Sequence, residues 1–218
     1  MRIRTLLLCL LIACNAWART DSSDSTATNK VYQGFSGGMM LHTGYLFGRD
    51  GNAPRTTDGR LCSPQGATFG IGGALRVNLW KHLRLGAEGY VSEMPSGATD
   101  CNDVLKAGSY VRMGYGGVLA DACWRLKKIW PYIGASIGGG AMKGLYILDG
   151  DQHSWSPDPN STFHKQAFFY ATPYVGLDYC MTQKVHLTFR LDWMLAVHDS
   201  RLCLPTGPRL FAGFMFCH

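Results

Sequence analysis

The clearest pattern in this chain is the stretch VHLTFRLDWMLAV at residues 185–197, in which every odd position carries an apolar side chain and most even positions carry a polar one. A period of two predicts a β-strand, because successive side chains of a strand point to opposite faces. Strands of soluble sheets have typically about 5–6 residues. A tilted strand that crosses a bilayer needs about 9–11 residues with one face in lipid, and this stretch fits that requirement.

Similar alternation recurs in seven further segments, at residues 35–47, 68–79, 83–91, 109–124, 132–145, 168–179 and 209–216. Pro173 weakens the 168–179 segment, because proline has no N–H to donate to a ladder. In segment 109–124 we place Val111, Met113 and Tyr115 on the apolar face and Arg112 on the polar face. Asp121 then falls on the apolar face, which indicates a bulge or an interface position.

The connections between these segments alternate in length. Three are short, at residues 80–82, 125–131 and 180–184, whereas four are long and rich in Asp, Asn, Ser, Pro and Gly, at residues 48–67, 92–108, 146–166 and 198–208. Short turns at one end and long polar loops at the other are typical of up-and-down outer-membrane barrels. An even number of strands places both termini at the short-turn end, which we predict to be periplasmic.

The N-terminus predicts export. Two arginines precede an apolar run and small residues at Ala16 and Ala18, so residues 1–18 are predicted to be a secretory signal peptide. The sequence at residues 11–14 also resembles a lipoprotein signal, which would place a lipid on Cys14. We predict a flexible periplasmic lead-in at residues 19–33 and a barrel domain at residues 34–218.

Composition narrows the class of function. The 27 glycines are about twice the usual share and lie inside the alternating segments, where strands curve or approach closely. Removal of the signal peptide lowers the formal charge from +6 to +4, and no run of Lys or Arg favours nucleic-acid binding. The sequence indicates no cofactor. His42 and His186 lack a second ligand at a useful spacing, so no metal site is predicted.

Alternation alone does not decide which face is inside the barrel. The polar faces carry charges of both signs, which can pair across a narrow lumen, and the predicted lumen network comprises Arg76, Arg84, Glu88, Arg112, Arg190 and Asp192. Aromatic residues gather towards segment ends, as in the interface girdles of membrane barrels. Both features favour an apolar face in lipid. The alternative is a soluble periplasmic barrel that binds an apolar ligand inside.

The last segment, Arg209 to Phe216, resembles the C-terminal assembly signal of bacterial outer-membrane barrels. It begins with a polar residue and has aromatics at its sixth and eighth positions, Phe214 and Phe216. It departs from that pattern at Phe211, where glycine is expected, and in the two residues after Phe216. With the eight segments, it makes the chain similar in architecture to small barrels of the OmpA/OmpX kind.

This resemblance implies an all-β, eight-stranded antiparallel up-and-down transmembrane β-barrel in the bacterial outer membrane. Its implied partners are outer-membrane lipid and, during biogenesis, the barrel assembly machinery. The leading hypothesis is a structural or surface-recognition role carried by four long extracellular loops, without an open pore. The ligand of those loops is not indicated by the sequence.

An enzymatic alternative rests on His198 and Ser200. Their His-x-Ser spacing resembles that of outer-membrane lipid A deacylases, in which a serine nucleophile is activated by a histidine base. No glutamate stands where it could orient the histidine, since Glu88 and Glu93 belong to a distant segment. A polar loop hinge explains the same residues without catalysis.

Six cysteines follow the signal peptide, and export permits disulfides. Cys62 and Cys101 lie in the first two long loops, at the same rim of the predicted barrel. We favour a disulfide between them, with Cys203 of the fourth loop as the competitor at that rim. Non-reducing peptide mapping distinguishes the two pairings.

The predicted orientation of strand 185–197 has a direct test. A charge on the lipid face at mid-membrane costs about 2–4 kcal/mol. Leu191→Arg is therefore expected to impair assembly far more than Thr188→Arg on the lumen face. The measurement is the heat-modifiable gel mobility of the folded barrel, and equal loss in both variants would contradict the assignment.

Overall fold

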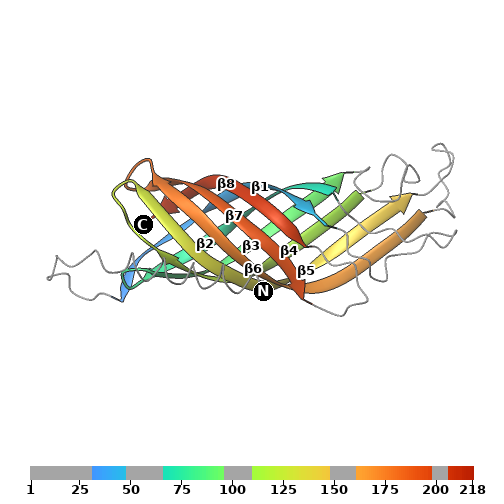
Figure 1. The fold of residues 1–218 in the computed structure, drawn as a ribbon, viewed down its shortest axis with the longest axis horizontal. Coiled ribbons are helices and arrows are strands. Elements are labelled where there is room, and N and C mark those ends of the chain that lie inside the picture. The colour runs from blue at the N-terminus through green and yellow to red at the C-terminus, as the bar shows by residue number, and fades with distance from the viewer. Residues whose placement is uncertain (1–30, 48–65, 96–109, 148–160, 198–205) are drawn as a thin grey trace, which may run out of the picture. The chain divides into compact units, whose positions relative to one another are not determined.

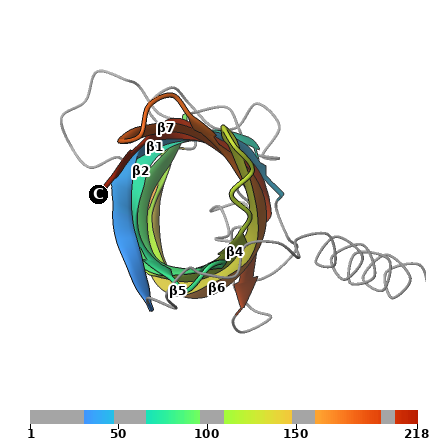
Figure 2. The same ribbon diagram turned by 90° about the vertical axis from the view of Figure 1, so that its left-hand side faces the viewer.

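The fold is an eight-stranded barrel, described by a computed structural model at residues 31–47, 66–95, 110–147, 161–197 and 206–218. Its strands are β1 (Tyr32–Leu46), β2 (Gly66–Leu79), β3 (Leu83–Pro95), β4 (Tyr110–Cys123), β5 (Ile129–Ile147), β6 (Ser161–Cys180), β7 (Val185–Val197) and β8 (Gly207–Cys217). Each strand pairs antiparallel with the next, and β8 pairs with β1 to close the ring (Figures 1 and 2). The predicted all-β, eight-stranded antiparallel fold is therefore confirmed.

The strand bounds lie within three residues of the predicted segments, except that β3 continues four residues further, to Pro95, and β6 begins seven residues earlier, at Ser161. β7 coincides with the predicted stretch, and β1 begins at Tyr32, two residues before the predicted domain boundary. The three short connections lie at one end of the barrel, and two of them contain a residue with positive φ, Trp80 at 49° and Lys127 at 47°. No helix among the described residues is long and apolar enough to span a bilayer.

Side chains alternate between the lumen and the outer surface as the period of two requires. In β7 the even positions from His186 to Met194 are buried, whereas Leu191 on the odd face is 52% exposed. The other strands display a wide belt of exposed apolar residues, among them Met39, Leu41, Ile71, Leu75, Val91, Val118, Ile137, Val175 and Leu210. The apolar surface of this barrel thus lies outside, the reverse of a soluble barrel.

Aromatic side chains border this belt at both ends. At the end of the short turns, exposed rings include Tyr32, Phe35, Trp80, Tyr179 and Phe216. At the other end, the rings of Tyr45 and Phe47 have centroids 5.2 Å apart, and Phe47 stacks on Trp193 at 6.0 Å. Such borders are typical of membrane barrels, where aromatic rings lie at the two interfaces.

The prediction for β4 was wrong in its choice of face. Val111, Met113 and Tyr115 are buried in the lumen, and Arg112 is exposed on the outer surface. Asp121 is buried on the lumen side without any bulge, because the register of β4 with both neighbours is continuous. The error arose because apolar side chains fill part of this lumen, so that the more apolar face of β4 is the inner one.

Pro173 fits the barrel because it lies where one ladder is interrupted. It pairs in register with Ala135 of β5, whereas the β6–β7 ladder has no pairs at residues 172 and 173 and then resumes in the same register. The missing N–H therefore interrupts hydrogen bonding locally without shifting the strands.

Close approach of the β4 and β5 backbones requires glycine. A Cβ atom added at Gly138 would lie 2.2 Å from the carbonyl oxygen of Gly116, whereas one added at Gly114 would meet nothing within 4 Å. We expect Gly138→Ala to destabilise the barrel by about 1–3 kcal/mol, the usual cost of overpacking. Gly114→Ala should leave the urea midpoint of the refolded protein nearly unchanged. Equal midpoints for the two variants would contradict this account.

Candidate functional site

The lumen holds a buried network of charged side chains. Among the described residues it contains four arginines and four carboxylates, namely Arg76, Arg84, Arg190, Arg209, Glu88, Asp121, Asp178 and Asp192. None is more than 7% exposed. Burying a charge is costly unless an opposite charge lies nearby, and these eight residues sum to zero formal charge.

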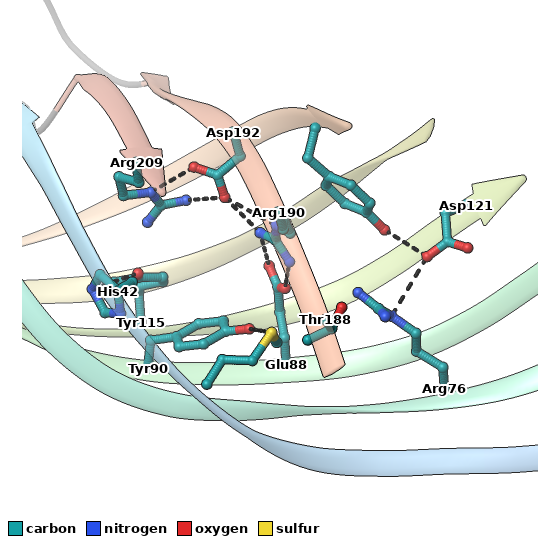
Figure 3. Close-up of polar contacts among 12 residues, drawn as sticks. His42, Arg76, Glu88, Tyr90, Tyr115, Asp121, Thr188, Arg190, Asp192 and Arg209 are labelled. Atoms are coloured by element: carbon teal, nitrogen blue, oxygen red, sulfur yellow. Dashed lines mark hydrogen bonds and ion pairs between the residues drawn. The ribbon is translucent and has the colours of Figure 1, made fainter. Parts of the chain in front are cut away.

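The first cluster joins Glu88, Arg190, Asp192 and Arg209 in one chain of contacts (Figure 3). Arg190 donates to Glu88 Oε2 at 2.5 Å and to Asp192 Oδ2 at 2.6 Å. Arg209 donates from Nε and Nη2 to the two oxygens of Asp192, at 2.8 and 3.0 Å. The bidentate geometry of the last pair is the strong form of the arginine–carboxylate interaction.

Phe211 packs inside this first cluster. Its ring centroid lies 4.8 Å from the guanidinium carbon of Arg190 and 5.3 Å from that of Arg209. Its ring also stacks on His42 at 4.8 Å. The residue that departs from the assembly-signal pattern is therefore fully buried, and it supports both arginines through cation–π contact.

The second cluster lies closer to the short turns and joins Arg76, Arg84, Asp121 and Asp178. Arg84 donates from Nε to Asp121 and from Nη1 to Asp178 Oδ2, the latter at 2.7 Å. Arg76 forms ion pairs with the same carboxylates at 3.5 and 4.0 Å, and none of its nitrogens has a hydrogen-bond partner. The cluster is thus held by two arginines that share two aspartates.

Neutral side chains complete the second cluster. Tyr132 lies beneath both guanidinium groups, 4.8 Å from that of Arg76 and 4.5 Å from that of Arg84. Tyr174 donates to Asp121 at 3.1 Å, and Thr188 donates to Asp178.

Thr188 is fully buried, so an arginine there would add a charge to a packed lumen. Thr188→Arg is therefore not a neutral control for Leu191→Arg, and Gln183→Arg in the exposed β6–β7 turn replaces it.

The structure brings together five of the six predicted network residues, the exception being Arg112. The side chain of Arg112 is 57% exposed and donates to Glu93 at 2.8 Å on the outer surface. Sequence reasoning missed Asp121, Asp178 and Arg209. In the alternating segment 168–179, Asp178 falls on the same face as Thr172 and could have been included. Asp121 was missed because the two faces of segment 109–124 were assigned the wrong way round.

The predicted assembly-signal residues are divided between the two faces of β8. Phe214 and Phe216 are exposed outside, and Arg209 is buried inside. Beyond Phe216, the backbone of His218 exchanges two hydrogen bonds of 2.9 Å with Phe35 of β1. The two additional residues therefore extend the closure of the barrel. A role of β8 in assembly remains a prediction.

A buried serine–histidine pair occurs at a place that the sequence did not suggest. His42 Nε2 lies 2.5 Å from Ser92 Oγ, and the hydroxyl of Tyr115 lies 3.5 Å from the same nitrogen. His42 and Ser92 are 4% and 1% exposed, so a lipid substrate does not reach them in this structure. We interpret the pair as part of the polar core.

Other predicted residues lie outside the described ranges. These are the deacylase-like pair His198 and Ser200, and the loop cysteines Cys62, Cys101 and Cys203. The described cysteines, Cys123, Cys180 and Cys217, form no disulfide. The catalytic and disulfide hypotheses stay predictions.

A polar cavity of about 200 Å³ lies at the short-turn end of the lumen, and its lining includes Arg84, Asp178, His186 and Cys217. The sulfur of Cys217 lies 3.4 Å from His186 Nδ1. Within the described ranges, no group of three or more His, Cys, Asp or Glu side chains is arranged to hold a metal ion. The ion pair between Arg84 and Asp178 forms part of the cavity wall.

A closed eight-stranded barrel with a charged lumen and an apolar exterior is the architecture of small outer-membrane β-barrels. No protein-family profile and no curated protein matches the sequence. Among solved structures, the Neisserial surface protein A is similar with a TM-score of 0.54 and 15% identity, over 86% of this chain and 99% of that one.

Two further solved structures share the fold. The outer membrane protein OprG of Pseudomonas aeruginosa has a TM-score of 0.52 and 9% identity, over 86% of this chain and 97% of its own. The attachment invasion locus protein Ail of Yersinia pestis was solved in complex with the heparin analogue sucrose octasulfate. It has a TM-score of 0.51 and 10% identity, over 85% of this chain and 99% of its own. At these identities the comparisons establish the fold alone.

Glu88 and Arg190 should contribute to the stability of the folded barrel as a coupled pair. Removing one partner of a buried pair typically costs about 3–5 kcal/mol, because the remaining charge is left unpaired. Glu88→Gln and Arg190→Gln are each expected to lower the urea midpoint strongly, and the double variant should lose clearly less than the sum of both. Glu93→Gln, which removes the exposed partner of Arg112, should change stability by about 1 kcal/mol at most. Additive losses would show that the two charges are not coupled.

Proposed function

We propose that the protein is an integral barrel of the bacterial outer membrane, without an open pore, whose structural or surface-recognition role is carried by the four long connections. The observation that carries this proposal is the inverted distribution of polarity. Acidic and basic side chains are buried in the described lumen, and most of the large exposed residues of the strands are apolar.

A lipid environment explains the outer surface. Exposed apolar patches on soluble monomers are usually limited to a few hundred Å², and larger ones mark contact with proteins or membranes. Here the apolar belt runs over all eight strands and is bordered at both ends by aromatic rings. The soluble alternative, with an apolar ligand inside, does not fit a lumen that is crossed by ion pairs between arginines and acidic residues.

The packed lumen supports the absence of a pore. Eight strands enclose an interior just wide enough for side chains to fill. Both ion-pair clusters reach across it, since Arg190 of β7 contacts Glu88 of β3, and Arg84 of β3 contacts Asp178 of β6. An ion that crossed this lumen would have to displace paired charges.

The long connections are the segments in which a recognition role would reside. They all leave the barrel at the end opposite the short turns, because consecutive strands are antiparallel. Loops on a rigid scaffold carry binding functions more often than the scaffold itself. That Ail was solved with sucrose octasulfate illustrates ligand binding by a protein of this fold, and the ligand of the present loops is left open.

Location and orientation can be tested together with epitope insertions. An epitope placed within residues 148–160 should bind antibody on intact bacteria. The same epitope placed between Lys127 and Lys128 should bind only after the outer membrane is permeabilised. The protein should also stay in the membrane fraction after washing with urea and high salt. Release without detergent, or antibody access to the short turn on intact cells, would contradict the proposal.

The absence of a pore can be tested separately from the location of the protein. Purified barrel reconstituted into planar bilayers is expected to show no stable single-channel conductance, and regular conductance steps would refute the sealed lumen.

A further inference from the structure

Charged side chains form a continuous row across four strands of the outer surface. In the strand register Glu93 of β3 pairs with Arg112 of β4, Arg112 with Lys143 of β5, and Lys143 with Lys165 of β6. All four residues are exposed. Directly opposed residues of neighbouring strands have Cβ atoms about 4.5–5.5 Å apart, so this row concentrates three cations and one anion on a small area.

The row is not neutralised within the described part of the chain. Glu93 accepts two hydrogen bonds from Arg112, at 3.1 and 2.8 Å, which compensates one cation. No ion pair to a described residue is seen for Lys143 or Lys165. Like charges at directly opposed positions destabilise a sheet, and an external anion bridging them would remove this cost.

The position of the two lysines relative to the apolar belt identifies the surroundings of that anion. On the outer face of β5, Ile137 is 60% exposed and Lys143 lies six residues closer to the long connections. On β6, Phe169 is 67% exposed and Lys165 lies four residues beyond it in the same direction. Each lysine is therefore the first charged residue on the outer face of its strand between the centre of the apolar belt and the long connections, and Leu145 follows Lys143 on that face. A lipid headgroup that approaches the barrel from this side can reach both lysines.

Small residues separate the lysines from the belt. The outward positions between them are Gly139 and Ala141 on β5 and Ala167 on β6. On β4, a Cβ atom added at Gly114 would meet nothing within 4 Å. Because these side chains are small, the outer surface between the lysines and the apolar belt protrudes little. An acyl chain of a lipid can lie flat against this surface while the headgroup of the same lipid reaches the lysines.

Among the residues that the structure describes, the outward cations near the long connections all lie on β4, β5 and β6. At the corresponding border, the outward residues of β1 and β7 are aromatic, with Tyr45 and Phe47 on β1 and Trp193 on β7. A general attraction to a charged membrane surface would be served equally well by cations spread around the whole barrel. A binding site for a single lipid requires the cations to lie together at one place.

We propose that Lys143 and Lys165, with Arg112 beside them, bind the phosphate group of a lipid in the membrane leaflet next to the long connections. The acyl chains of that lipid pack on the small outward residues of β4, β5 and β6. This inference rests on the proposed membrane location and adds to it a ligand class, a phosphorylated lipid.

The test compares lipid binding by matched variants. The purified barrel, folded in an uncharged maltoside detergent, is titrated with diphosphorylated lipid A and with the same lipid after enzymatic dephosphorylation, and binding is followed by native mass spectrometry. The wild type should prefer the phosphorylated lipid. The double variant Lys143→Gln/Lys165→Gln should lose about tenfold or more of that affinity, since each lysine near an anionic lipid surface contributes about a factor of five.

The control removes the same charge elsewhere. Lys127→Gln/Lys128→Gln, in the β4–β5 turn at the opposite end of the barrel, should bind like the wild type. Raising salt should weaken wild-type binding more than binding by Lys143→Gln/Lys165→Gln. Equal binding of both lipids by the wild type, or equal losses in the two double variants, would overturn the inference. So would competition by inorganic phosphate as effective as that by the lipid, because a site for free phosphate does not need the membrane.

These outcomes are separable from failure of the proposed function. If the barrel sits in the membrane with the predicted orientation but shows no preference for phosphorylated lipid, only the lipid site is refuted. If the protein is released without detergent, the membrane proposal itself fails, whatever the lipid titration shows.

Discussion

Neutralisation of charge inside a narrow closed lumen is the constraint on which the rest of this structure depends. Four arginines cannot be buried without partners, and each finds a carboxylate on another strand or at a neighbouring position. Arg84 reaches Asp178 across the lumen, and Arg190 reaches Glu88 in the same way. The eight charges lie on six strands, all except β1 and β5. A slip of one residue in any of these six would turn its charged side chain outward, so the pairs select one register among those that alternation alone permits.

The sequence predicted the strands well because a period of two is a local property. The stretch at residues 185–197 needed no information from the rest of the chain, and its charged positions Arg190 and Asp192 were assigned correctly to the lumen. The alternation within β4 does not reveal which of its two faces points into the lumen. Its inner face carries Tyr115 and its outer face carries glycine and Arg112, so hydrophobicity pointed to the wrong side.

Contacts between distant strands were beyond the reach of sequence reasoning for a geometric reason. Asp121 meets Arg84 of the neighbouring strand, but it also meets Arg76 and Tyr174, which depends on how all eight strands are staggered around the ring. Phe211 shows the same limit. As part of a terminal motif it was only a departure from an expected glycine, whereas in the closed barrel it lies against Arg190 and Arg209 from the adjacent and its own strand.

The orientation of β4 links the interior to the outer surface. With the opposite face inward, Arg112 would join the lumen and Asp121 would leave it, so that five arginines would oppose three carboxylates and the buried charges would no longer balance. The same reversal would place the carboxylate of Asp121 within the apolar belt and remove Arg112 from the row with Lys143 and Lys165. The orientation observed keeps the charges of the lumen balanced and, by the same geometry, places a third cation beside Lys143 and Lys165 on the outer surface. The balanced charge of the lumen and the row of cations on one side of the outer surface therefore both follow from which face of β4 points inward.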